Sequence, residues 1–147
     1  YDTEYIIVRE EKVANHFVVS AASPLAKAGK ISLEELIRQP FILTEKGMSY
    51  RRFLDEQLAQ RSLEIIPVLE IGNPHLICDM VCKGTGVSFL PDFVTEKSRR
   101  AGKLLYLDIP EIQVTIWKQL LHHRDKWISP QIDSVLKFCV EKEFRES

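Results

Sequence analysis

The stretch from Thr44 to Arg52, TEKGMSYRR, gathers residue types that together can bind a small anion. Thr44 and Ser49 supply hydroxyl groups, Lys46 supplies a positive charge, and Gly47 allows a ligand to approach the backbone closely. A helix predicted to begin at Ser49 adds unpaired N–H groups and the positive end of its dipole. The alternative is an ordinary helix start that Ser49 caps, with solvated charges around it.

A second loop of this kind follows the apolar segment 63–71 and consists of Gly72 and Asn73. Pro74 comes next and favours the first position of a helix, where its missing N–H costs nothing. Asn73 can cap that helix, bind a ligand, or do both through different atoms. Capping alone is the simpler explanation, and the sequence leaves the alternatives open.

His75, Cys78 and Cys82 lie three and four residues apart, near one face of a predicted helix, as a metal or redox site requires. Structural zinc needs four ligands, however, and the fourth is missing nearby. Cysteines one helical turn apart rarely meet the geometry of a disulfide. Packing in the core therefore explains the cysteines better, and we expect no metal and no cofactor.

The sequence also lacks the common catalytic motifs. We find no nucleophile elbow, phosphate loop or metalloprotease helix, and GTG at 84–86 follows a predicted helix, the reverse of the order in a dinucleotide fingerprint. Gly84 instead fits the left-handed end of a helix. We therefore expect no catalytic residues and no enzyme.

The elements that must position the two loops follow from local patterns. Apolar and β-branched runs predict strands, of which the first two are separated by the charged stretch 9–12; they cover residues 5–8, 17–21, 41–44, 63–71, 87–91, 104–109 and 114–125. Pro67 places the fourth strand at an edge or in a bulge. Capping residues and apolar stripes predict helices over residues 32–39, 49–62, 73–84 and 129–143, and a short helix and turn over 92–103.

Strands that alternate with helices indicate an α/β fold with a mixed or mostly parallel sheet covered by helices. Such sheets bind ligands at the carboxyl ends of their strands, where loops lead into helix N-termini. The two loops described above follow the predicted strands 41–44 and 63–71 in this way.

Composition limits the class of protein. The chain has 147 residues, 45% of them hydrophobic, a net charge of −1 and no apolar run long enough to cross a membrane. A balanced charge excludes direct binding to nucleic acid. Three cysteines favour a reducing, cytoplasmic compartment. The first residue is Tyr1 and not Met, which indicates a portion of a longer protein.

Two long stretches carry a family resemblance. They are FVVSAASPLAKAGKISLEELIRQPFILTEKGMSYRRFLDEQL and VLEIGNPHLICDMVCKGTGVSFLPDFV. In order, over about residues 9–140, they resemble the effector-binding domain of LysR-type transcriptional regulators. The V-x-x-G-x-G-[IV]-x-x-[LV]-P signature of that family matches Val81, Gly84, Gly86, Val87, Leu90 and Pro91.

The resemblance implies a periplasmic-binding-protein-like (type II) fold, in which two α/β subdomains joined by crossover strands enclose a small-molecule cleft. We expect a crossover strand from the first subdomain at residues 1–12 and the second regulatory subdomain at 13–113. Residues 114–147 would hold the return crossover strand and the closing helix of the first subdomain. The rest of that subdomain and the N-terminal helix-turn-helix would lie outside this chain.

The resemblance also implies a function. The effector would be a small molecule, and Lys46 and the helix start favour an anion such as a carboxylate. It would contact Thr44, Lys46, Gly47, Met48, Ser49, Ile71, Gly72 and Asn73. Binding would shift the angle between subdomains and so bias a homo-oligomer, a dimer or tetramer, that reaches DNA only through the helix-turn-helix. The alternatives are a solute-binding protein of a transporter, which needs a signal peptide, and an enzyme on the same fold, which needs an acid, base or nucleophile cluster.

Overall fold

The structure is a computed structural model that describes residues 5–28, 30–123 and 131–139, with side chains described for residues 11–28 and 30–117. Its strands are β1 Tyr5–Ser20, β2 Ile42–Leu43, β3 Leu69–Glu70, β4 Ser88–Pro91, β5 Leu104–Leu107, β6 Thr115–His123 and β7 Gln131–Cys139. Its helices are α1 Pro24–Lys27, α2 Leu33–Leu36, α3 Ser49–Gln60, α4 Pro74–Cys82 and α5 Asp92–Arg100.

The sheet is mixed, as the sequence predicts. β1 pairs antiparallel with β4, β5 and β6, whereas β2 and β3 pair in parallel. A parallel bridge between Phe41 and Val87 joins the two parts, and the Val87 backbone N–H donates to the Pro40 carbonyl at 2.9 Å. β2, β3 and β4 therefore all run in the same direction.

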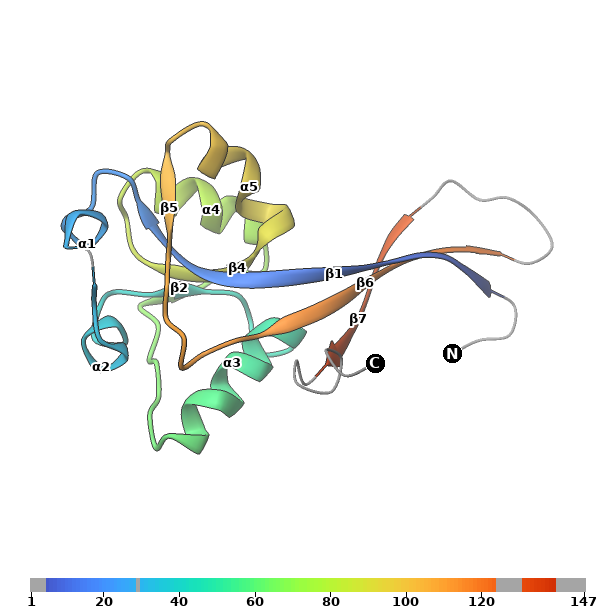
Figure 1. Cartoon of the computed structure of the whole chain (residues 1–147), viewed down its shortest axis with the longest axis horizontal. Coiled ribbons are helices and arrows are strands. Elements are labelled where there is room, and N and C mark those ends of the chain that lie inside the picture. The colour runs from blue at the N-terminus through green and yellow to red at the C-terminus, as the bar shows by residue number, and fades with distance from the viewer. Residues whose placement is uncertain (1–4, 29, 124–130, 140–147) are drawn as a thin grey trace.

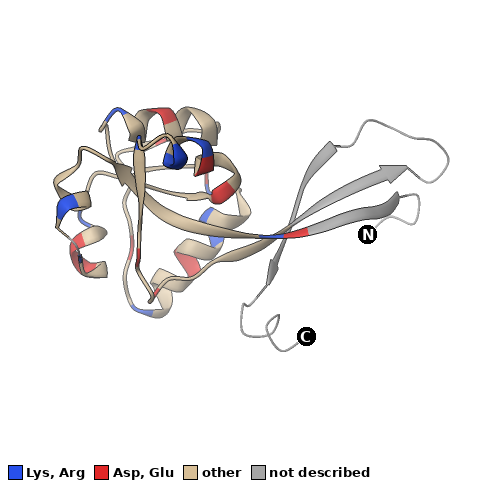
Figure 2. Ribbon diagram, turned by 45° about the horizontal axis from the view of Figure 1, so that its top comes forward, with Lys and Arg blue, Asp and Glu red and all other residues tan. Residues whose placement is uncertain are grey.

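Helices cover the sheet on both sides, with α4 and α5 on one face and α2 and α3 on the other (Figure 1). Three phenylalanines tie the strands together in the core: the Phe17 ring on β1 lies 4.8 Å from the Phe89 ring on β4 and 6.0 Å from the ring of Phe41, centroid to centroid. All three are buried. Figure 2 shows basic and acidic residues interspersed on the helices, with both signs on α5.

Helix ends follow the local sequence closely. The Ser32 hydroxyl accepts a hydrogen bond from the Glu35 N–H at 3.1 Å and so caps α2, as predicted. Gly84 has φ of 81° just after α4, which confirms its left-handed conformation. Both signals act between neighbouring residues, which is why the local sequence contains them.

The first strand is longer than its sequence pattern. Residues 5–8 and 17–21 were predicted as two strands with the charged stretch 9–12 between them, but one strand, β1, runs from Tyr5 to Ser20. The separation is wrong because β6 pairs with β1 through the charged stretch, with a register shift between Ile7 and Arg9. β1 and β6 thereby form an arm that extends from the α/β body (Figure 1).

Two further predictions differ from the structure. The strand predicted over 63–71 is reduced to Leu69–Glu70, although β3 does lie at an edge as Pro67 implied. The helix predicted from 129 to 143 is wrong over its described part, since residues 131–139 form β7, antiparallel to β6. A helix over these residues would need another surface to cover its apolar stripe. The edge of β6 is available instead, and residues 131–139 pair with it as β7.

Candidate functional site

Three helices begin at one edge of the sheet. Because β2, β3 and β4 are parallel, their carboxyl ends meet there, and α3, α4 and α5 start after them. β1 is antiparallel to β4, with Asn15 opposite Pro91, so the arm leaves the body at this same edge. The fold therefore places both predicted loops at the edge of the sheet from which the arm leaves.

The predicted site residues divide by burial. Thr44, at the end of β2, is only 1% exposed, so its side chain belongs to the core. The other seven lie at the surface or just beneath it: Lys46, Gly47, Gly72 and Asn73 are exposed, and Met48, Ser49 and Ile71 are half-buried. A ligand at this edge would reach the latter group directly and Thr44 through its neighbours.

Glu45 connects the two loops, a contact that the local sequence does not predict. Its carboxylate lies against Gly72, because a Cβ placed on Gly72 would stand 2.9 Å from Glu45 Oε1. A side chain at position 72 would displace the flexible end of Glu45. Glu45 also adds a negative charge beside Lys46, so the edge carries both signs.

The start of α3 differs from the prediction that Ser49 caps it. Ser49 is the first residue of α3, Met48 occupies the N-cap position, and no described side chain caps this helix. The prediction is wrong because the Met48 N–H donates to the Glu45 carbonyl at 3.1 Å, a turn that moves the helix start by one residue. The first N–H groups of α3 therefore remain available to an acceptor outside the described side chains.

Asn73 caps α4. Its Oδ1 accepts hydrogen bonds from the backbone N–H groups of His75 at 3.0 Å and Leu76 at 3.3 Å. Pro74 stands at the first helical turn, as predicted. The capping alternative for Asn73 is confirmed, and its exposed amide nitrogen can still face a ligand.

Replacing Asn73 by alanine should lower the free energy of unfolding by about 1 kcal/mol, because two N–H groups of α4 lose their acceptor. Urea denaturation measures this difference. Asn73→Asp keeps the acceptor oxygen and should retain the stability. An unchanged midpoint for Asn73→Ala would show that the two hydrogen bonds contribute nothing.

Tyr50 lies in the core directly behind the α3 start and is 1% exposed. No described group meets its hydroxyl at hydrogen-bonding distance and angle. Burial raises the pKa of Tyr50 to about 12, and the nearby Thr44 side chain offsets only part of this rise. The hydroxyl therefore stays neutral at physiological pH.

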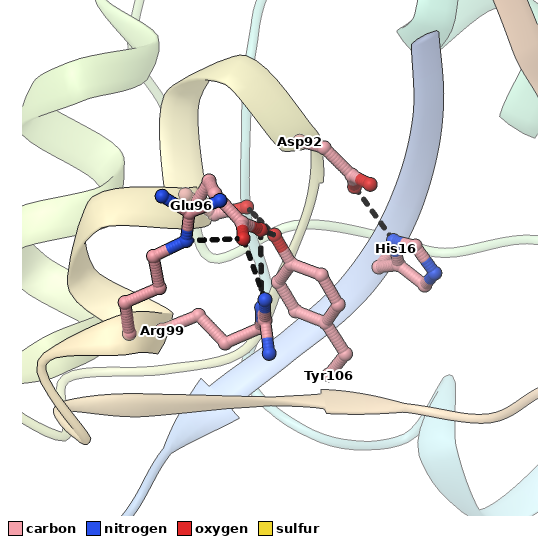
Figure 3. A network of polar contacts seen from close by, with 7 residues as sticks. His16, Asp92, Glu96, Arg99 and Tyr106 are labelled. Atoms are coloured by element: carbon pink, nitrogen blue, oxygen red, sulfur yellow. Dashed lines mark hydrogen bonds and ion pairs between the residues drawn. The ribbon is translucent and has the colours of Figure 1, made fainter.

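A polar network joins the arm to the body at the same edge (Figure 3). His16 Nδ1 on β1 lies 2.6 Å from Asp92 Oδ1 at the start of α5, and the His16 ring stacks on Tyr106 with centroids 4.3 Å apart. The Tyr106 hydroxyl lies 2.8 Å from the hydroxyl of Thr95 and donates to Glu96 at 3.1 Å. These contacts fix the direction in which β1 leaves the sheet.

The electrostatics of this network are those of a solvated ion-pair cluster. Hydrogen bonds, first from Arg99 and also from Tyr106 and Arg100, hold the pKa of Glu96 down at about 2. Burial is the main cause that raises the pKa of Tyr106 to about 12. Nearby, residues of β1 and of the segment 107–115 line a cavity of about 200 Å³. Asn15 donates a hydrogen bond to the Val114 carbonyl at 2.9 Å there.

The cysteine and histidine helix gives no sign of a metal site. Cys78 is buried, with Sγ 3.7 Å from the hydroxyl oxygen of Ser98, and burial is the main cause that raises its pKa. Cys78 and Cys82 are free thiols, and Cys78 packs in the core as predicted. Within residues 11–28 and 30–117, no three His, Cys, Asp or Glu side chains are grouped to hold a metal ion.

No helix in the described part of the chain is both long and apolar enough to span a membrane. The architecture is that of a mixed α/β domain with two loops at the carboxyl edge of its sheet. A family model for the LysR substrate binding domain matches residues 12–143. The chain belongs to this family and is an effector-binding domain of the LysR type.

Proteins with similar sequences are transcriptional regulators. The chain is 34% identical over 137 residues to the HTH-type transcriptional regulator YeiE of Escherichia coli K12, covering 90% of this chain and 46% of YeiE. It is 28% identical over 112 residues to the HTH-type transcriptional activator CmpR of Synechocystis, covering 76% of this chain and 37% of CmpR. The chain thus spans less than half the length of these relatives, which are transcriptional regulators.

Among solved structures, the effector binding domain of QuiR in complex with shikimate has a TM-score of 0.65 at 20% identity, covering 88% of this chain and 62% of that one. The bromide-bound regulatory domain of HypT from Salmonella typhimurium also scores 0.65, at 16% identity, with 99% and 64% covered. The fold is therefore the periplasmic-binding-protein-like type II fold of LysR effector-binding domains.

Proposed function

We propose that this chain senses a small metabolite at the edge where α3 and α4 begin, and that the metabolite is an anion such as a carboxylate. The observation that carries the proposal is the meeting of two helix-start loops at one edge of the sheet, where Glu45 lies against Gly72. Support for an anion comes from the uncapped N-terminus of α3 and the exposed Lys46 next to it. Glu45 restricts the anion to the Lys46 side of the edge.

The site would consist of Lys46, Gly47, Met48, Ser49, Ile71, Gly72 and Asn73, with Thr44 supporting them from beneath. Residues 13–113 would be the second regulatory subdomain, residues 1–12 the crossover strand that enters it, and residues 114–147 the return to the first subdomain. The remainder of the first subdomain would supply the opposite wall. Effector contacts that differ between two subdomain angles would shift the equilibrium between them.

The intact protein would be a cytoplasmic homo-oligomer that reaches DNA through an N-terminal helix-turn-helix outside this chain. Two observations support this division of labour: the curated relatives are HTH-type regulators about twice as long, and this chain carries a net charge of only −1. A balanced charge gives little attraction to a phosphate backbone. The arm, held by His16 and Asp92, would transmit the subdomain angle.

Removing both hydroxyls by Thr44→Ala with Ser49→Ala in the intact regulator should abolish the effector response and leave operator binding unchanged. A reporter gene measures the response, and gel shift measures operator binding. The matched control is Thr85→Ala with Ser98→Ala, which removes two hydroxyls elsewhere on the domain and should keep the response. A normal response in the first double variant would remove these loops from the site.

The chemical class can be tested on the same protein with a panel of small carboxylates and their neutral amides. Binding to the folded state alone raises stability by about 2.7 kcal/mol when the ligand is at 100 times its Kd, so a thermal shift detects it. We expect shifts with carboxylates that Lys46→Gln weakens. Shifts with the amides alone would contradict the anion proposal.

A further inference from the structure

Arg51, in the first turn of α3, is a charged residue placed where charge is costly. Its side chain is only 2% exposed. Nη1 donates to the Thr44 carbonyl and to Glu70 Oε2, both at 2.7 Å, and Nε donates to Asp55 Oδ2 at 3.0 Å. A buried guanidinium requires such partners, because an unpaired charge in the interior costs several kcal/mol.

Two of the three partners of Arg51 stand at neighbouring strand ends, and the third, Asp55, lies one turn further along α3. Thr44 follows β2 and precedes the loop 45–48, whereas Glu70 ends β3 and precedes the loop 71–73. The last backbone hydrogen bond between these strands runs from the Ile71 N–H to the Leu43 carbonyl at 3.0 Å. Beyond this hydrogen bond, the side chain of Arg51 joins the two strand ends.

We propose that Arg51 is a positioning residue that fixes the separation of the two effector loops. That the two loops bind an effector rests on the proposed function. The contacts of Arg51 with their strand ends do not depend on it. β2 and β3 pair over two residues each, so the backbone ladder alone resists splaying weakly. The guanidinium adds two charge-assisted hydrogen bonds to one carboxylate and one carbonyl across that junction.

The electrostatics agree with a shared cation. Burial is the first cause of the raised pKa of Asp55, whereas Arg51 and Lys46 lower that pKa and Glu70 raises it. Asp55 and Glu70 thus share one guanidinium, Asp55 through Nε and Glu70 through Nη1. Their side chains are 36% and 40% exposed, so water screens the carboxylates from outside while Arg51 itself stays buried. Arg51 is therefore the member of the cluster that cannot be replaced by solvent.

The test is amide hydrogen exchange on the intact regulator without effector. Arg51→Met should raise exchange at least tenfold at the hydrogen-bonded amide of each loop, Met48 in the first and Ile71 in the second, and leave the interior of α4 and strand β4 within twofold of the wild type. Arg52→Met is the matched control, since it removes the same charge one residue along, where the Arg52 guanidinium lies over the Phe53 ring at 4.9 Å. It should leave both loops unchanged.

Two milder variants keep the test decisive if Arg51→Met fails to fold. Glu70→Gln, at a carboxylate 40% exposed, should raise exchange in both loops by at least threefold, whereas Glu64→Gln, an exposed carboxylate of the same segment, should not. Arg51→Lys keeps one charged nitrogen that can reach both strand ends and should restore at least half of the protection.

Exchange that rises in one loop only, or equally in α4 and β4, would overturn the positioning role. So would unchanged loops in both Arg51→Met and Glu70→Gln. Because this experiment contains no effector, its failure is distinct from a failure of the proposed function, which the response of the Thr44 and Ser49 variant decides.

Discussion

Replacing Gly86 by alanine is expected to lower the free energy of unfolding by about 2–4 kcal/mol. A Cβ at this position would stand 2.7 Å from the Pro40 carbonyl oxygen and 3.4 Å from two side-chain carbons of Ile42. That carbonyl accepts the hydrogen bond from Val87 that joins β2 to β4. The backbone must move, and the junction of the two parts of the sheet is strained.

Urea denaturation measures the loss, and two other glycines separate its causes. Gly47→Ala should be nearly neutral, since its Cβ would meet no atom within 4 Å. Gly84→Ala has the same open space but φ of 81°, so it should cost about 1–2 kcal/mol from backbone strain alone. A Gly86→Ala variant as stable as Gly47→Ala would contradict the close approach of the two strands.

Above pH 10 the free energy of unfolding should fall by about 2–3 kcal/mol through Tyr50 alone. Its pKa is raised from 10.0 to about 12 in the folded state, mainly by burial. The unfolded chain releases this proton near pH 10 and the folded protein only near pH 12. Stability is therefore complete below pH 10 and is lost as the pH rises to 12.

Tyr50→Phe isolates this contribution. The variant should show a flatter pH dependence between pH 10 and 12, because it lacks the Tyr50 hydroxyl that titrates there. Tyr106, whose pKa is also raised to about 12, is more exposed and affects both proteins equally. At neutral pH we expect Tyr50→Phe to equal the wild type or exceed it by about 1 kcal/mol, since a buried hydroxyl without a well-placed partner is removed. A loss of stability at neutral pH would instead indicate a hydrogen bond to Thr44.

The two candidate loops could be found from the sequence because each is a local signal. A glycine, a hydroxyl or amide residue and the start of a helix occur within a few positions after a predicted strand. Asn73 behaves as its sequence context predicts and caps α4. Ser49 does not, because the turn at Glu45 shifts the start of α3, and one residue of shift lies within the usual uncertainty of helix ends.

The residues that join these loops could not be found in the same way. Arg51 looked like one of several surface charges on a helix, and its burial depends on Glu70, nineteen positions away in the chain. Glu45 gains its importance from lying against Gly72, and His16 from meeting Asp92 on another element. The sequence indicated this role only through a basic residue in the first turn of the helix, three positions before Leu54 on the apolar side.

By itself the sequence determined the alternation of strands and helices, most helix ends, the positions of the two loops and the resemblance to the LysR family. These depend on propensity, capping and spacing, which act within about ten residues. The tertiary structure decided that β1 is one continuous strand, that residues 131–139 pair with β6, and that Arg51 bridges β2 and β3. Edge pairing and the burial of a charge depend on which distant surface is available, and local sequence does not carry that information.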